Sequence, residues 1–168
     1  MTELQDIPWS ADGTLEVLTF DLGGETFAIE AVVLREIVDP LPETLVPGAH
    51  PLVGSVVNFR GQVIPLADLR VGFGMERGEF GADSRIVVLE IAIDGEPLQV
   101  GIRTDRVNEV ATLAAEAAEP PPALGLRWPR ELVRALVRRA GDVVILPDLA
   151  AMIRPLLTEH VPPAAVAA

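Results

Sequence analysis

Side chains that could perform chemistry are scarce in this chain of 168 residues. Cysteine and lysine are absent, which excludes a thiol nucleophile, a thiolate metal site and a lysine-dependent phosphate loop. The two histidines, His50 and His160, are far apart in the sequence and make a poor zinc site. A Ser-His-Asp site would have to combine them with Ser10, Ser55 or Ser84, none of which lies in a Gly-x-Ser-x-Gly elbow. We therefore interpret both histidines as loop residues and expect no metal or other cofactor.

Asp68 and Asp148 are the best candidates for a pair of catalytic carboxylates. An all-β barrel that binds a small ligand or acts as an enzyme needs polar groups that converge in one pocket. Each aspartate, however, follows an apolar run in the same local context, which is typical of a helix N-cap. We favour the helix-cap interpretation and keep the ligand-binding or enzymatic barrel as the alternative.

That shared context belongs to a long internal repeat. Residues 52–69 (LVGSVVNFRGQVIPLADL) match residues 132–149 (LVRALVRRAGDVVILPDL) without a gap. Each copy has an apolar run, a central Gly, a second apolar run and a closing Asp-Leu. Weaker matches upstream include Glu36 with Glu109, so the chain is a tandem pseudo-repeat. The units cover about residues 15–75 and 84–157, and we expect them to share an interface because units this small rarely supply a large core.

The elements that position these motifs are mainly strands. Alternating residues over 15–22, followed by Gly23-Gly24 and a return strand at 26–29, predict a β-hairpin. The run RIVVLEIAI at 85–93, followed by Asp94-Gly95, predicts another hairpin. Residues 70–84 and 114–130 are expected to be loops.

Residues 132–138 are ambiguous by themselves, because their apolar spacing also suits a helix that begins after Pro129. The counterpart at 52–57 contains Val, Gly and Ser before an Arg-Gly turn, which favours a strand in both copies. A short closing helix is predicted at 148–157, limited by Pro155. Residues 1–14 and 158–168 are expected to be flexible tails.

Charge and hydropathy exclude several classes of partner. The net charge of −12 should repel nucleic acid, and the acidic surface serves either solubility or attraction of a basic partner. No run of 18 apolar residues is present, so no membrane insertion is expected. The first residues lack the apolar core of a secretory signal, which fits a cytoplasmic protein.

Two charged residues are not explained by packing. The backbone explains the glycine at position 61, since a tight turn needs a positive φ there. Arg60 has no such explanation, and it is either a solvated charge or an interface residue. Glu36, in the segment LREIV, is either an exposed strand position or a structural residue of the repeat.

At these residues the chain resembles the CheW family. The segment VVNFRGQVIPLADLR at 56–70 is similar to the family signature, with Phe59 where Leu is usual. The segments LREIVDP, GIRTDRVNEV and GDVVILPDLAAMI also resemble CheW elements, and together they cover residues 15–157 in the expected order. The resemblance implies a mostly β fold of two pseudo-symmetric five-stranded SH3-like barrels packed around a hydrophobic groove, with short helices and a C-terminal helix.

The resemblance also implies a function and its residues. It implies a non-catalytic cytoplasmic adaptor, recruited to receptor arrays, that joins the cytoplasmic tips of chemoreceptors to the regulatory domain of the histidine kinase CheA. Leu34, Glu36 and Arg60 fall where receptor or kinase coupling is sensitive, and Asn58 and Gly61 shape the adjacent hairpin. Three more partner-binding residues are implied on the matching segment of the second barrel: Gly101, Val107 and Val110.

Overall fold

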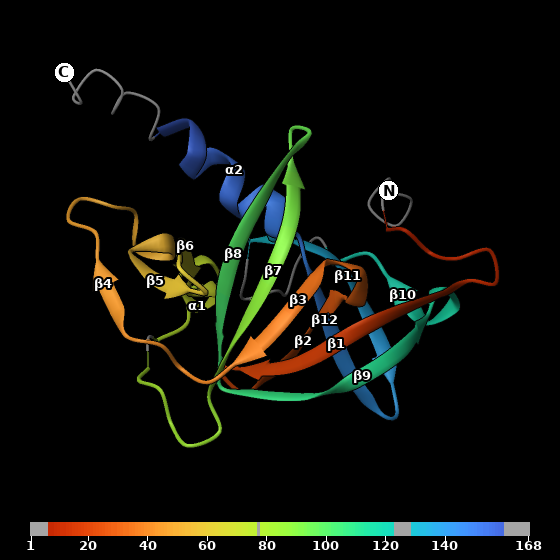
Figure 1. Cartoon of the computed structure of the whole chain (residues 1–168). Helices are drawn as coiled ribbons and strands as arrows, with labels where there is room; N and C mark the ends of the chain where they lie inside the picture. Colours follow the sequence, from red (N-terminus) through yellow and green to blue (C-terminus); the bar gives the residue numbers. More distant parts are fainter. Residues whose placement is uncertain (1–6, 77, 123–128, 160–168) are drawn as a thin grey trace.

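The computed structural model describes residues 7–76, 78–122 and 129–159, without the side chains of 157–159. In this part of the chain the strands form two curled sheets that lie side by side (Figure 1). The mostly β fold is therefore confirmed. Each sheet contains six strands rather than the expected five, and each has a very short strand at one edge, β4 or β10.

The first sheet has the strand order β10-β11-β12-β2-β1-β9. Its strands are β1 (Thr14–Leu22), β2 (Glu25–Glu30), β9 (Arg106–Ala114), β10 (Ala118–Glu119), β11 (Val133–Arg139) and β12 (Asp142–Pro147).

The second sheet has the strand order β3-β7-β8-β6-β5-β4. Its strands are β3 (Leu34–Val38), β4 (Glu43–Leu45), β5 (Ser55–Phe59), β6 (Gln62–Ala67), β7 (Arg85–Ile93) and β8 (Glu96–Thr104).

The two halves of the sequence exchange strands between these sheets. In the first sheet β2 runs parallel to β12, and in the second β8 runs parallel to β6. Each sheet thus takes strands from both sequence units, 15–75 and 84–157. Neither unit by itself contains a complete sheet, so the units must fold against each other.

Strands β1 and β7 are buried on both faces. In β1, Val17 packs inside the first sheet, whereas Leu18 and Phe20 pack in a large core shared by both sheets. In β7, Val88 packs inside the second sheet and Val87 faces the shared core. This double burial explains why the sequence of β7 is almost continuously apolar instead of alternating.

The sequence repeat appears as matched backbone geometry. The β5–β6 turn has φ of 51° at Arg60 and 82° at Gly61, and the β11–β12 turn has 51° at Ala140 and 86° at Gly141. Positive φ at both central residues is the type I′ pattern that suits hairpins. After each hairpin, a backbone N–H bonds back to the start of the repeat, from Asp68 to the Leu52 carbonyl and from Asp148 to the Leu132 carbonyl.

Short helices follow the two hairpins, as the helix-cap interpretation of Asp68 and Asp148 predicted, although residues 70–72 were expected to be part of a loop. The α-helices are α1 (Leu69–Gly72) and α2 (Leu149–Glu159), and the 3-10 turns are η2 (Ala31–Val33), η3 (Pro51–Val53), η4 (Ala115–Ala117) and η5 (Arg130–Leu132). The strand predicted at 132–138 is confirmed as β11, and the closing helix is confirmed as α2. Helix α2 contributes Met152 and Ile153 to the shared core.

The expected N-terminal tail is folded where the structure describes it. Ile7 is buried and Trp9 is partly buried against the core of the first sheet. Both side chains are large and apolar, and burying them removes that area from water. Of the expected C-terminal tail, residues 160–168 lie outside the described residues.

Replacing Gly61 with valine should lower the free energy of unfolding by about 1–3 kcal/mol, because a β-branched residue would be held at positive φ. Urea unfolding followed by circular dichroism measures the change. Gly81→Val is the control, since Gly81 is exposed, lacks a positive φ and has open space where a Cβ atom would lie. The control should unfold within about 0.5 kcal/mol of wild type. Equal destabilisation of both variants would contradict the role of the turn.

Candidate functional site

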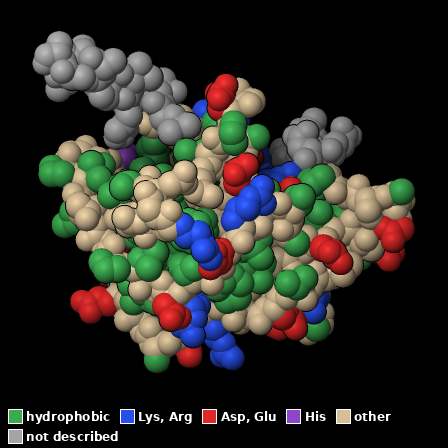
Figure 2. Space-filling model, in the orientation of Figure 1, with side chains coloured by type: hydrophobic (Ala, Val, Ile, Leu, Met, Phe, Trp, Pro, Cys, Tyr) green, Lys and Arg blue, Asp and Glu red, His purple; other side chains and the backbone are tan. Residues whose placement is uncertain are grey.

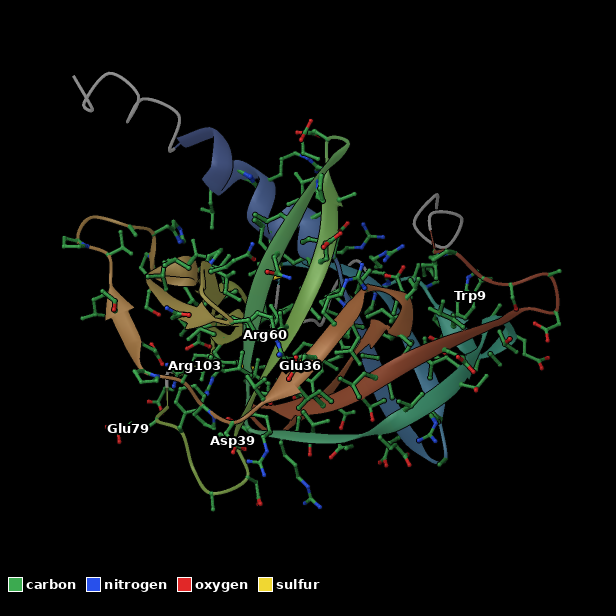
Figure 3. The ribbon with its side chains drawn as sticks, in the orientation of Figure 1. Trp9, Glu36, Asp39, Arg60, Glu79 and Arg103 are labelled. Carbon is green, nitrogen blue, oxygen red and sulfur yellow. The ribbon has the colours of Figure 1, made fainter. Side chains whose placement is uncertain are left out.

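The centre of the candidate site is a contact between Arg60 and Glu36. Arg60 lies at the tip of the β5–β6 hairpin, and its Nε donates to Glu36 Oε1 at 2.9 Å, with Nη2 donating to the same oxygen. Glu36 lies on β3, which is separated from the hairpin by two strands of the same sheet. Figure 3 shows the two side chains directed toward each other across this face. Residues that are 24 positions apart therefore form one charged cluster.

Local backbone geometry places Arg60 at this tip. Asn58 Oδ1 accepts the N–H of Gly61 at 2.9 Å, which ties the hairpin turn together. The Arg60 guanidinium carbon lies 5.3 Å from the centre of the Phe59 ring, within range of a cation–π contact. Phe59 itself is buried inside the second sheet, so the turn is anchored on its apolar side.

The pair remains accessible although both charges are satisfied. The Arg60 side chain is 68% exposed and that of Glu36 is 34% exposed. An exposed ion pair of this kind contributes little to folding stability. In the same orientation, Figure 2 shows basic and acidic side chains meeting near the centre of this face, with hydrophobic side chains below them. The pair is thus accessible from solvent, and it is not held in place by burial.

Strand β3 is an edge strand and carries the predicted residue Leu34. Leu34 is half-buried opposite Leu89 and packs against the shared core. The register of β3 shifts between Leu34 and Glu36, so Arg35 is an irregular position and its side chain points to solvent. The outer edge of β3 is unpaired in the described sheet, which leaves backbone groups free for a partner.

Strand β9 is the corresponding edge of the first sheet. Val110 is 60% exposed, whereas Val107 is half-buried against the shared core. The register of β9 shifts opposite Thr19 and Phe20, and Asn108 next to this irregularity donates to Asp21 Oδ1 at 2.9 Å. The resemblance placed both valines at the site, and the structure gives only Val110 a large exposed apolar surface.

Gly101 lies apart from these surfaces. It is buried in β8 between Val88 and Leu66, and a Cβ there would meet Ile86 Cγ2 at 3.0 Å. The glycine therefore allows close packing inside the second sheet and contacts no exposed part of the site.

The second sheet carries an apolar groove whose lining residues were not predicted from the sequence. Its volume is about 280 Å³, and it lies between the β5–β6 hairpin, β8 and helix α2. The groove is lined by Val46, Ala49, Val53, Val56, Pro65, Leu98, Val100, Ile153 and Leu156. Val63 is 68% exposed and shares a face of β6 with Pro65. The signal in the sequence is that Val63 and Pro65 occupy the outward positions of the alternating segment QVIPLA, where polar residues are usual.

The two candidate carboxylates serve as helix caps. Asp68 Oδ1 accepts the N–H of Arg70 at 3.1 Å, and Asp148 Oδ1 accepts the N–H of Ala151 at 2.9 Å. They begin different helices, one in each copy of the repeat, and line no common pocket among those described. The helix-cap interpretation is therefore confirmed.

The described residues offer neither a metal site nor a membrane-spanning helix. His50 Nδ1 accepts the N–H of Leu52 at 3.1 Å and begins a 3-10 turn, as a loop histidine does. His160 lies outside the described residues. Within residues 7–76, 78–122 and 129–159, no cluster of three acidic or histidine side chains could hold a metal ion. No helix in the same ranges has the length and hydropathy needed to cross a bilayer.

Exchanging the charges of the central pair should have only a small effect on folding. Arg60→Glu places two carboxylates together and should lower the free energy of unfolding by less than about 1 kcal/mol. Adding Glu36→Arg should recover most of this loss. Urea unfolding of the two single variants and the double variant gives the coupling energy. A coupling above about 2 kcal/mol would contradict the interpretation of the pair as an exposed contact.

Sequence comparison with known proteins identifies a family that shares these features. The model of the CheW-like domain family matches residues 16–156, which is most of the chain. The chemotaxis protein CheW of Rhizobium meliloti (strain 1021) is 27% identical over 138 residues, covering 82% of this chain and 86% of that protein. The chemotaxis protein CheW of Klebsiella aerogenes is 29% identical over 134 residues, covering 80% of this chain and 78% of that protein.

A solved structure agrees with these sequence matches. The crystal structure of the scaffolding protein TtCheW from Thermoanaerobacter tengcongensis superposes with a TM-score of 0.71 at 25% sequence identity. The match covers 80% of this chain and 84% of that protein. The paired curled sheets described above are therefore the fold of a known scaffold.

Proposed function

The chain belongs to the CheW family of non-catalytic chemotaxis scaffolds, and we propose that it couples chemoreceptors to the histidine kinase CheA. In this proposal the partners are the cytoplasmic tips of the receptors and the regulatory domain of the kinase. The protein then acts in the cytoplasm and is recruited to receptor arrays. The observation that carries the proposal is the accessible Arg60–Glu36 pair beside the exposed edge strand β3.

The geometry supports binding rather than chemistry. An adaptor needs surfaces that two partners can reach, and the edge strands β3 and β9 provide unpaired backbone groups with exposed apolar side chains such as Val110. In Figure 1, β3 lies near the centre of the view and β9 runs along the lower edge of the molecule. Arginine suits such a surface because its planar, permanently charged group can exchange one carboxylate for another.

The apolar groove supports a second contact in the same proposal. Its lining is almost entirely aliphatic, and the exposed Val63 continues this character along the outer face of the hairpin. Burial of such a surface by another protein is favourable because it removes apolar area from water. We infer that the kinase covers this groove while a receptor engages the strand edges near Arg60.

A reconstituted kinase assay tests the role of Arg60. The receptor and the kinase are those that co-purify with this protein from its native cell. Arg60→Glu should reduce receptor-stimulated phosphorylation by about tenfold or more, because a reversed charge at an interface repels its former partner.

Arg138→Glu is the matched control for this assay. Arg138 lies on the equivalent hairpin of the other repeat, is 72% exposed and pairs with Glu119 at 2.9 Å. Both variants change the net charge equally, so only the location differs. The proposal is supported if the Arg138→Glu protein stimulates the kinase normally and the Arg60→Glu protein does not. Equal stimulation by both variants would remove Arg60 from the functional surface.

A further inference from the structure

We propose that Asp105 and Arg70 are positioning residues that fix the angle between the two sheets, and hence between the surfaces that bind different partners. The inference rests on the proposed function for its consequence, although the geometry can be tested without any partner. Asp68, Arg70, Asp105 and Gly23 together form the crossover cluster.

Asp105 lies at the point where the chain passes from the second sheet to the first. Strand β8 of the second sheet ends at Thr104, and strand β9 of the first sheet begins at Arg106. A single residue therefore connects the two sheets at this point. Its backbone N–H donates to the Asp21 carbonyl at 2.9 Å. Any rotation of one sheet against the other must change the backbone angles near Asp105.

The Asp105 carboxylate bonds to both sheets. One oxygen accepts the N–H of Gly23, in the β1–β2 turn of the first sheet, at 2.8 Å. The other oxygen lies 3.1 Å from Nη2 of Arg70, in helix α1 directly after β6 of the second sheet. Because a carboxylate is rigid and planar, these two bonds set the separation of the Gly23 turn and helix α1.

Arg70 is held firmly enough to transmit this constraint. Its side chain is only 8% exposed, and its Nε lies 3.4 Å from Asp68 Oδ1. Asp68 is buried and caps helix α1, so the guanidinium lies between two carboxylates. An arginine that is buried in this way loses little additional side-chain freedom when it binds Asp105.

Gly78, in the segment that connects the two sequence units, lies against Arg70. A Cβ placed on Gly78 would lie 2.5 Å from Arg70 Nη1, so glycine leaves the space that the guanidinium occupies. The Gly78 carbonyl accepts from Nη2 of Arg103 at 3.1 Å, and the Arg103 guanidinium lies 4.0 Å from the centre of the Phe80 ring. Figure 3 shows Arg103 and Glu79 at this side of the second sheet.

The crossover cluster lies close to the candidate binding strand. Val107 and Val110 follow Asp105 by two and five residues on β9. Arg60 and Glu36 belong to the other sheet. The relative placement of these two surfaces therefore depends on the angle that the cluster sets. The competing explanation is that the shared apolar core alone fixes this angle.

Pulsed electron spin resonance distinguishes these explanations. The sequence contains no cysteine, so Val63→Cys on β6 and Val143→Cys on β12 give one spin label on each sheet. In this labelled protein, Asp105→Ala should broaden or shift the distance distribution between the labels. Asp83→Ala is the control, since it removes the same charge from an exposed position and should leave the distribution narrow.

A second pair of variants perturbs the cluster from the other side. Gly78→Ala places a methyl group 2.5 Å from Arg70 Nη1, so the guanidinium or the loop must shift, whereas Gly81→Ala adds the same methyl group in open space. Gly78→Ala should change the distance distribution in the same sense as Asp105→Ala, and Gly81→Ala should not. An unchanged distribution in both Asp105→Ala and Gly78→Ala would overturn the proposal in favour of the shared core.

Binding measurements then test the consequence. Asp105→Ala and Gly78→Ala should bind each partner alone within about twofold of wild type, yet reduce receptor-stimulated kinase activity at least about threefold. Full stimulation despite an altered distribution would overturn the positioning role. If the wild-type protein itself fails to stimulate any kinase, the proposed function fails, while the spin-label distances still decide whether the cluster sets the angle.

Discussion

The burial of β1 and β7 on both faces is the constraint on which the rest of this structure depends. Each strand has one face inside its own sheet and the other face in the shared core. Separating the sheets would expose the aromatic rings of Phe20 and Phe27, which lie 5.8 Å apart in that core, and the apolar face of β7. Since burial of such area is the dominant favourable term in folding, the two sheets form one cooperative body.

This constraint also decides which parts of the sheets can meet a partner. The central strands pair with neighbours on both sides, so in the described sheets the unpaired backbone groups lie at the edges, and β3 and β9 are the longer edge strands. The Arg60–Glu36 pair lies beside one of these edges. Because an exposed pair adds little to stability, breaking it would cost the folded protein little free energy. A rigid interior with a weakly held charged surface is appropriate for a scaffold that performs no catalysis.

The internal repeat shows how one backbone can carry two different surfaces. The two hairpin turns have nearly the same φ values, and each is followed by an aspartate that caps a helix. Their exposed residues differ, because Arg60 of the first turn corresponds to Ala140 of the second. The two copies have similar positive φ values where the turn requires them. Their side chains differ where they face solvent. The two hairpins therefore share one backbone conformation and differ in the side chains that they expose.

The sequence by itself determined the main hairpins and the closing helix of this protein, and its scarcity of nucleophiles and bases favoured an adaptor over an enzyme. Alternation and Gly-containing turns located the hairpins, because these signals act between near neighbours in the chain. The internal repeat identified residues 132–138 as a strand, which the structure has at Val133–Arg139. The tertiary structure alone decided how the strands are distributed between the sheets, since β2 with β12 and β8 with β6 are pairs between distant segments. It also decided that Gly101 is buried and that Asp105 bonds to both sheets. Such contacts depend on packing over the whole chain, for which local spacing carries no signal.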